Sequence, residues 1–242
     1  MIRTHPIGVA LLIALFASSI VACGDSAETA AQQRKLNELQ NRLQRLQSKV
    51  GAAQDISAIK KLQRAYGYYL DRGLADDMAD LFTRNDPTAE YGNGGVFNTQ
   101  DSIRKAFHAL VPNGNRLAEG QMTTHMQLQG VVHVDDAGNT AKARWRAFAM
   151  TAHDGQAYWQ EGPYEMDYIK EDGIWKIKKL RWYQTFTAPY EGGWAKKRPA
   201  VIRSATGSNL PKPDLPPSEP DEKSWPDVSV TRFHYVNPVT GR

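Results

Sequence analysis

Few residues in this chain could perform chemistry, because its 242 residues include one cysteine and six histidines. No two histidines have the spacing of a His-x-Glu-x-His metal site, and no Gly-x-Ser-x-Gly nucleophile elbow occurs. The glycine-rich run at residues 92–95 is not followed directly by a helix start, which a phosphate-binding loop requires. The sequence therefore predicts no metal and no cofactor, and it leaves acid–base chemistry by histidine.

His125 is a candidate for such chemistry, and it lies inside a predicted strand. An imidazole that faces an apolar interior titrates near the working pH, so it can take a proton from carbon or give one to a leaving hydroxyl. The alternative is that this histidine is only a hydrogen-bonded polar group of the core. His108, His133 and His234 carry less weight, since they fall in a helix, beside a turn and in the C-terminal tail.

The elements that must position His125 are predicted as helices followed by strands. Apolar periodicity predicts helices over residues 55–73, 74–82 and 99–110. A brief strand is expected at 88–91, and long strands are expected at 123–134, 140–152, 158–170 and 175–187. This order predicts an α+β fold in which a strongly curved antiparallel sheet packs on the N-terminal helices. We expect a cone with an apolar pocket inside.

Several separated segments resemble SnoaL-like domains of the nuclear-transport-factor-2-like superfamily. The matching segments are Tyr-Gly-Tyr-Tyr-Leu-Asp-Arg-Gly at 66–73, Ala-Asp-Leu-Phe at 79–82, Thr-Ala-Glu-Tyr-Gly at 88–92, Thr-His-Met at 124–126 and Asp-Gly-Ile-Trp-Lys-Ile at 172–177. The resemblance covers roughly residues 55–190 and implies the α+β cone. It does not specify a reaction, because this fold hosts dehydratases, isomerases, cyclases and non-catalytic binders.

The polar pocket residues resemble those of scytalone dehydratases most closely. Asp71, Tyr91 and His125 stand where those proteins carry a pocket aspartate, tyrosine and histidine. The resemblance implies that His125 and Asp71 form an acid–base pair and that Tyr91 holds a substrate oxygen or a water. The second pocket histidine of that group has no match on the following predicted strand, 140–152.

Each of these residues also has a purely structural interpretation. Asp71 is followed by Arg72 and a glycine, so it could simply satisfy backbone donors at a turn. A tyrosine after a helix is commonly a core residue with a bonded hydroxyl. We expect Tyr66, Tyr69 and Trp145 to line the pocket, which predicts an apolar or aromatic ligand.

The first 22 residues have the pattern of a secretory signal peptide, with Arg3, an apolar run and small residues before Cys23. The sequence Ile-Val-Ala-Cys at 20–23 resembles a bacterial lipobox, in which the cysteine thiol carries a lipid. We therefore expect a lipid-anchored protein of the cell envelope, with the outer membrane or the periplasmic face favoured because Gly24 is not aspartate. The alternative is an ordinary signal peptide.

Residues 23–54 are predicted to form a tether and then an amphipathic helix. Apolar residues alternate at spacings of three and four, as in a coiled-coil seam: Leu36, Leu39, Leu43, Leu46 and Val50. This helix is either an oligomerising stalk or one helix that packs on its own domain. Asp55 is expected to cap the start of the next helix.

Residues 191–242 are predicted to be irregular, because five prolines occur between 211 and 220. Aromatic residues in this extension indicate that it docks on its own domain or contacts a partner. The net charge of +4 comes from scattered residues, so nucleic acid is not expected as a partner.

The sequence as a whole predicts a lipoprotein whose SnoaL-like domain binds an apolar small molecule. The leading hypothesis is a cofactor-independent dehydratase or isomerase. The alternative is a non-catalytic ligand-binding or scaffold lipoprotein, and self-association is left open by the leucine seam.

Overall fold

The computed structural model describes residues 26–111, 116–196, 210–228 and 231–242. The predicted signal peptide and the predicted lipidation site at Cys23 lie outside these ranges. The chain divides into two compact units, Met1–Leu46 and Gln47–Arg242, which are described separately. Among the described helices, none has an apolar stretch long enough to cross a membrane.

Helix α1 spans Ser26–Arg72 without interruption. The predicted tether and the predicted start of a separate helix at Asp55 are therefore wrong for the residues from Ser26 onward, since the helix continues through Gly51. A single glycine costs a helix about 1 kcal/mol, which good helix formers on both sides offset. Asp55 does not cap a new helix, since its carboxylate accepts a hydrogen bond from Trp175 Nε1 at 2.9 Å and pairs with Lys170 Nζ at 2.6 Å.

Two further helices and two short strands follow α1 in the second unit. They are α2 (Ala75–Asp80), β1 (Thr88–Tyr91), β2 (Val96–Phe97) and α3 (Gln100–Leu110). Helix α3 begins where the sequence predicts, because the Thr99 hydroxyl accepts a hydrogen bond from the Ser102 backbone N–H. Strand β1 is also found at its predicted residues, and β2 was not predicted.

The remaining strands complete a seven-stranded sheet with the order β2-β1-β6-β5-β4-β3, in which β7 pairs with β5. They are β3 (Met122–Val134), β4 (Thr140–His153), β5 (Gln156–Glu171), β6 (Ile174–Trp182) and β7 (Phe186–Pro189). All described pairings of these strands are antiparallel except that of β1 with β6. The predicted strand 175–187 is divided in two, because the backbone at Tyr183 crosses over Gly162.

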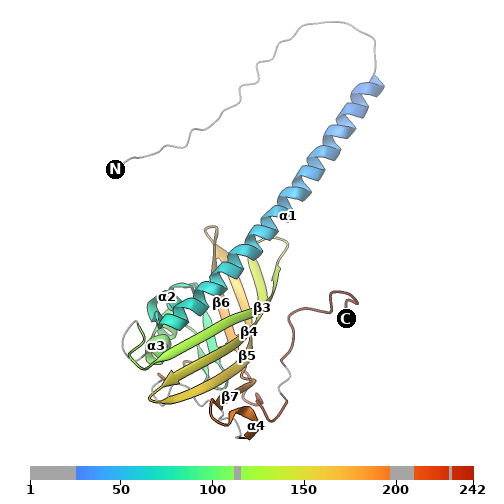
Figure 1. Cartoon of the computed structure of the whole chain (residues 1–242). Helices are drawn as coiled ribbons and strands as arrows, with labels where there is room; N and C mark the ends of the chain where they lie inside the picture. The colour runs from blue at the N-terminus through green and yellow to red at the C-terminus, as the bar shows by residue number, and fades with distance from the viewer. Residues whose placement is uncertain (1–25, 112–115, 197–209, 229–230) are drawn as a thin grey trace, which may run out of the picture. The chain divides into compact units, whose positions relative to one another are not determined.

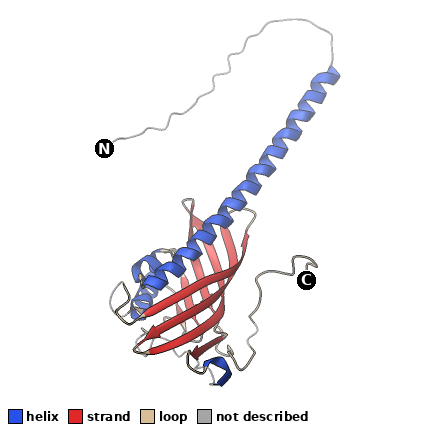
Figure 2. Ribbon diagram, in the orientation of Figure 1, coloured by secondary structure: helices blue, strands red, loops and turns tan. Residues whose placement is uncertain are grey.

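The sheet curves around the C-terminal part of α1 together with α2 and α3, as Figures 1 and 2 show. Alternate residues on the strands meet these helices in one continuous core. Fully buried members come from every layer: Ile59, Tyr66, Met78, Phe82, Phe107, Tyr164, Tyr168, Ile177 and Leu180. The expected α+β fold with a curved sheet over N-terminal helices is confirmed.

The C-terminal extension is irregular apart from the short helix α4 (Gly193–Lys196). Its described part forms hydrogen bonds with the rest of the second unit. Leu215 forms an antiparallel bridge with Val96, and the Asp214 carboxylate accepts a hydrogen bond from the Asn98 backbone N–H at 2.8 Å. The extension thus docks on its own domain.

Candidate functional site

The close contact between α1 and β3 positions the candidate site. Gly67 permits this contact, since a Cβ there would lie 3.0 Å from both Gln127 Cγ and the His125 carbonyl oxygen. Tyr66 and Asp71, on the same helix, are thereby brought beside strand β3. A side chain at Gly67 would push the helix away from His125.

His125 projects from β3 toward the helices, and its Nε2 lies 3.0 Å from the Tyr164 hydroxyl. Burial lowers the pKa of His125 from 6.5 to about 4, because the charged imidazolium loses its hydration. The imidazole is therefore neutral at physiological pH. A neutral ring can accept a proton, so the site provides a base.

A chain of tyrosines extends from His125 across the interior. The Tyr164 ring packs edge-on against that of Tyr66, with centroids 6.2 Å apart, and the Tyr66 hydroxyl lies 2.8 Å from that of Tyr91. Burial raises the pKa of Tyr66 to about 12 and holds those of Tyr91 and Tyr164 well above 10. All three hydroxyls are protonated and can donate hydrogen bonds at neutral pH.

Asp71 contacts His125 through the main chain. Its Oδ1 accepts a hydrogen bond from the His125 backbone N–H at 2.5 Å. Burial raises the pKa of Asp71, and the bond to His125 and the charge of Arg72 oppose this shift. The structure thus brings together the two residues of the predicted pair, while a contact between the carboxylate and the imidazole ring stays a prediction.

The other predicted pocket residues occupy different surroundings. Trp145 is buried, its Nε1 donates to the Tyr168 hydroxyl at 3.0 Å, and its ring fills the space that the missing Cβ of Gly130 leaves. Tyr69 is partly buried and packs against the core. An apolar pocket lined by these residues stays a prediction.

A chain of largely buried hydrogen bonds that was not predicted from the sequence connects Trp145, through Tyr168 and Gln63, to Gln127 on β3. Tyr168 donates to Gln63 Oε1 at 2.6 Å, and Gln63 Nε2 donates to Gln127 Oε1 at 2.8 Å. Gln63 lies four residues after Ile59 on the apolar face of α1, and a polar residue at such a position is a sequence signal for a buried hydrogen bond. Tyr164 shares its strand face with Met166, so the alternation could have identified it.

Trp182 also lies at this site, and its side chain is buried. In the sheet it pairs with Tyr91 on one side and with Tyr164 on the other. Within the described ranges, its buried Nε1–H has no hydrogen-bond partner. A buried donor without an acceptor is unfavourable, and a ligand oxygen would satisfy it.

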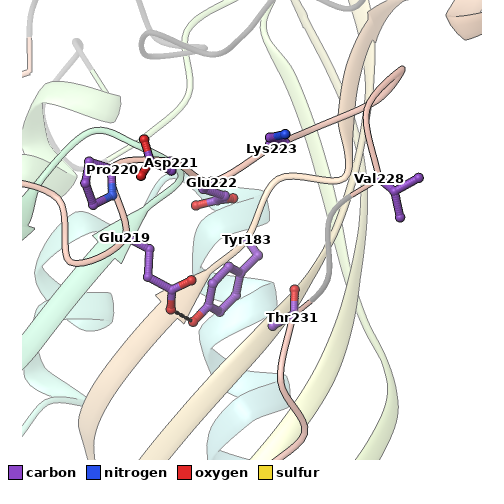
Figure 3. A pocket seen from close by; sticks show the side chains of 8 residues that line it. All are labelled: Tyr183, Glu219, Pro220, Asp221, Glu222, Lys223, Val228 and Thr231. Carbon is purple, nitrogen blue, oxygen red and sulfur yellow. Dashed lines mark hydrogen bonds between the residues drawn. The ribbon is translucent and has the colours of Figure 1, made fainter.

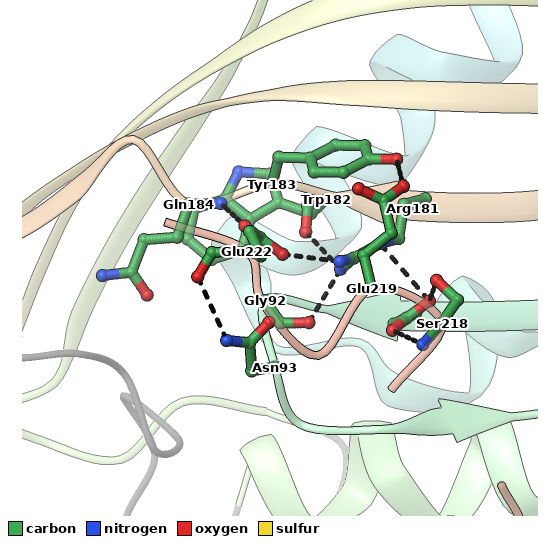
Figure 4. Close-up of polar contacts among 10 residues, drawn as sticks. Gly92, Asn93, Arg181, Trp182, Tyr183, Gln184, Ser218, Glu219 and Glu222 are labelled. Carbon is green, nitrogen blue, oxygen red and sulfur yellow. Dashed lines mark hydrogen bonds and ion pairs between the residues drawn. The ribbon is translucent and has the colours of Figure 1, made fainter. Parts of the chain in front are cut away.

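The opposite face of the sheet carries a charged cluster around Arg181 (Figure 4). Its guanidinium lies 2.5 Å from Glu222 Oε2 and 3.3 Å from Glu90 Oε2, and it donates to the Gly92 carbonyl oxygen at 2.7 Å. Ser218, in the C-terminal extension, donates to Glu90 from both its backbone and its hydroxyl. The extension is therefore bonded to β1 and β6 by charged groups.

A cavity of about 400 Å³ lies beside this cluster (Figure 3). It is lined by Tyr183, Glu219, Pro220, Asp221, Glu222, Lys223, Val228 and Thr231. The Tyr183 hydroxyl donates to Glu219 at 2.7 Å within it. This polar cavity does not include His125, and it differs from the apolar pocket that the sequence predicts. In the described part of the chain, no cluster of metal-binding side chains occurs.

Comparison with known proteins supports the resemblance seen in the sequence. A model of the family described as the SnoaL-like domain matches residues 51–181. A search among curated proteins finds no match to this chain.

The fold is similar to several solved structures. A protein proposed to be a scytalone dehydratase, from Novosphingobium aromaticivorans DSM 12444, is 20% identical with a TM-score of 0.51, covering 59% of this chain and 91% of that one. A hexachlorocyclohexane dehydrochlorinase, LinA Type2, is 16% identical with a TM-score of 0.51, covering 60% and 94%. The LinA-type3 enzyme of Novosphingobium barchaimii LL02 is 15% identical with a TM-score of 0.50, covering 60% and 95%. These likenesses establish the fold.

Proposed function

The chain belongs to the SnoaL-like domain family, and we propose that its domain is a cofactor-independent lyase or isomerase that acts on an apolar or aromatic small molecule. The observation that carries this proposal is the neutral imidazole of His125 at the end of a chain of protonated tyrosines. A base and several donors in one apolar interior are what a proton transfer from carbon requires.

The proposed step is the loss of water from a β-hydroxy ketone. His125 takes the proton from the carbon between the carbonyl and the hydroxyl-bearing carbon, and the C–H electrons form the new double bond as the hydroxyl leaves. In the tautomer in which Nε2–H donates to Tyr164, the lone pair of Nδ1 is the base. The imidazolium proton then reaches the departing hydroxide, and the neutral ring is restored.

The polar groups around His125 have separate tasks in this proposal. Tyr91 and the unpartnered Nε1–H of Trp182 hold the substrate carbonyl oxygen, on which negative charge develops. Asp71 fixes the strand that carries His125 by accepting its backbone N–H, and it thereby positions the base. The names of two structural neighbours denote losses of water and of hydrogen chloride, which are both eliminations.

The experiment uses 3-hydroxy-1-tetralone, which loses water to give fluorescent 1-naphthol. We expect turnover by the protein, and we expect His125→Gln to lower it by about 10²-fold or more. His133→Gln is the matched control, because His133 lies on the same strand and is exposed. Equal rates in the wild-type protein and His125→Gln would contradict the proposed base.

The second candidate is a ligand-binding domain without turnover. It is favoured by one observation: the residue that pairs with His125 on β4 is the buried Ala149, so that neighbouring position supplies no second acid or base. Binding of 1-naphthol, followed through tryptophan fluorescence, without conversion of the tetralone would support this candidate.

We also propose that the chain is exported and carried on a lipid attached to Cys23, at the cell envelope. The support is the signal-like leader and the Ile-Val-Ala-Cys sequence at 20–23, in which cleavage before Cys23 would leave the cysteine at the new N-terminus. Metabolic labelling with radioactive palmitate in a bacterial host tests it. Incorporation of the label into the Cys23→Ser variant would exclude Cys23 as the site of attachment. A scaffold role would then not depend on a lipid at this residue.

A further inference from the structure

The leucine seam of α1 is an apolar stripe along one side of the helix, and in the described part of the chain its side chains are left exposed. Leu36, Leu39, Leu43 and Leu46 are about half exposed, at 48%, 49%, 56% and 51%, and Val50 continues the stripe at 55%. Isolated apolar side chains at a surface are ordinary, but five in register along one helical face are the pattern of a packed interface.

The seam assigns a heptad position to every neighbouring residue. With Leu36, Leu43 and Val50 at positions a, the residues Leu39 and Leu46 occupy positions d. The three g positions are then all basic: Lys35, Arg42 and Lys49. The three following e positions are all glutamine: Gln40, Gln47 and Gln54.

This division of charge selects one arrangement of two helices. In a parallel pair, each g residue faces the e′ residue of the next heptad, so Lys35 meets Gln40 and Arg42 meets Gln47. In an antiparallel pair, g faces g′, and the basic residues would oppose one another. Like charges across such an interface are unfavourable. Glutamine is neutral, so it can accept a hydrogen bond from Lys or Arg without electrostatic repulsion.

We propose that residues 33–54 pair with the same segment of a second copy of this chain as a parallel, in-register coiled coil. The occupant of the seam is a second copy because the same face supplies both the basic and the neutral partner that parallel pairing requires. This interaction is independent of the chemistry proposed at His125. It provides a way to hold two SnoaL-like domains together through their N-terminal helices.

Cysteine cross-linking in the full chain tests the proposal directly. Cys23→Ser removes the native thiol, and the protein is purified in mild detergent because its leader is apolar. In this background Leu36→Cys places one thiol at an end of the seam, where only parallel copies bring equal residues together. Asn41→Cys is the matched control at position f, on the opposite side of the helix.

On mild oxidation we expect Leu36→Cys to move from 27.0 kDa to twice that mass on a non-reducing gel, while Asn41→Cys stays at 27.0 kDa. Failure of Leu36→Cys to cross-link, or equal cross-linking at both positions, would overturn the proposal. Both substitutions lie on exposed positions, so neither outcome depends on refolding of the domain.

A second variant examines the orientation. Gln40→Glu with Gln47→Glu would create g–e′ ion pairs with Lys35 and Arg42 in a parallel pair, and e–e′ repulsion in an antiparallel one. We expect the dissociation constant measured by sedimentation equilibrium at low salt to fall about tenfold. A rise in the dissociation constant would contradict parallel pairing.

Discussion

The two faces of the curved sheet bury polar groups in opposite ways. On the face toward the helices, the His125 imidazole is bonded to the neutral hydroxyl of Tyr164, and burial lowers its pKa to about 4. On the other face, Arg181 is fully buried between the carboxylates of Glu90 and Glu222. The helix face keeps a titratable group uncharged, whereas the outer face compensates one charge with two others.

The difference shows what each face is suited to do. A neutral imidazole with protonated hydroxyls beside it can move protons, because its state changes at moderate cost. A buried guanidinium held by two carboxylates cannot change its state, so it serves as a structural link between the sheet and the extension. The described residues of the extension that bond to this face, such as Ser218 and Glu222, are thus part of the folded domain, and the proposed chemistry uses the helix face.

Removing the charge of Arg181 from the outer face should have the largest effect on the free energy of unfolding. We expect Arg181→Met to lower the free energy of unfolding by about 3–5 kcal/mol, because it leaves Glu90 and Glu222 buried without their partner. Urea unfolding of the full chain measures this. Lys105→Met is the control, since its ion pair with Asp101 is mostly exposed and its loss should leave the midpoint unchanged. Equal midpoints for both variants would contradict the account of the outer face.

The neutral state of His125 on the helix face should make the free energy of unfolding depend on pH. The pKa of His125 is about 4 in the folded protein, whereas the ordinary value for histidine is 6.5. Between pH 4 and pH 6.5 the imidazole therefore binds a proton in the unfolded chain but not in the folded one. The free energy of unfolding should therefore fall as the pH falls from 6.5 to 4, by about 3 kcal/mol in total.

Comparison with His125→Gln isolates this contribution, because the shifts of other groups such as Asp71 are common to both proteins. The difference in unfolding free energy between the two should shrink by that amount across the window. A difference that stays constant with pH would show that His125 is not buried in its neutral form.

A smaller effect is expected from the tyrosine chain itself. Tyr66→Phe removes the hydroxyl that is hydrogen-bonded to Tyr91, and we expect it to destabilise the fold by about 1–2 kcal/mol. Tyr68→Phe is the control on the same helix, because Tyr68 is 71% exposed. Thermal unfolding distinguishes them, and equal melting temperatures would mean that this hydrogen bond contributes nothing to stability.

Much of the fold followed from local patterns in the sequence. The helix over 100–110 and strand β1 were found where capping residues and composition place them. The separate helix expected to start at Asp55 was wrong, because the favourable helix formers around Gly51 outweigh one glycine. The turn within 175–187 was missed, because it depends on the approach of Tyr183 to Gly162, which is distant in sequence.

The site was predictable only in part, for a similar reason. Asp71, Tyr91 and His125 were named from the resemblance and Tyr66 as a pocket-lining residue, and the structure brings Tyr66 to Tyr91 and Asp71 to His125. The main-chain bond from Asp71 could not be anticipated, since it depends on how closely Gly67 lets α1 approach β3. The Arg181 cluster was likewise hidden, because its carboxylates come from residues 90 and 222.

The central claim is that the helix face holds His125 as a neutral base, and an NMR titration of its imidazole tests this most directly. In protein labelled with ¹³C-histidine, the His125 signal is assigned by its loss in His125→Gln. We predict a pKa of about 4, with the ring neutral throughout the range where the protein is stable. A pKa at or above the ordinary value of 6.5 would contradict the account, because the ring would then carry a charge when the proposed proton transfer begins.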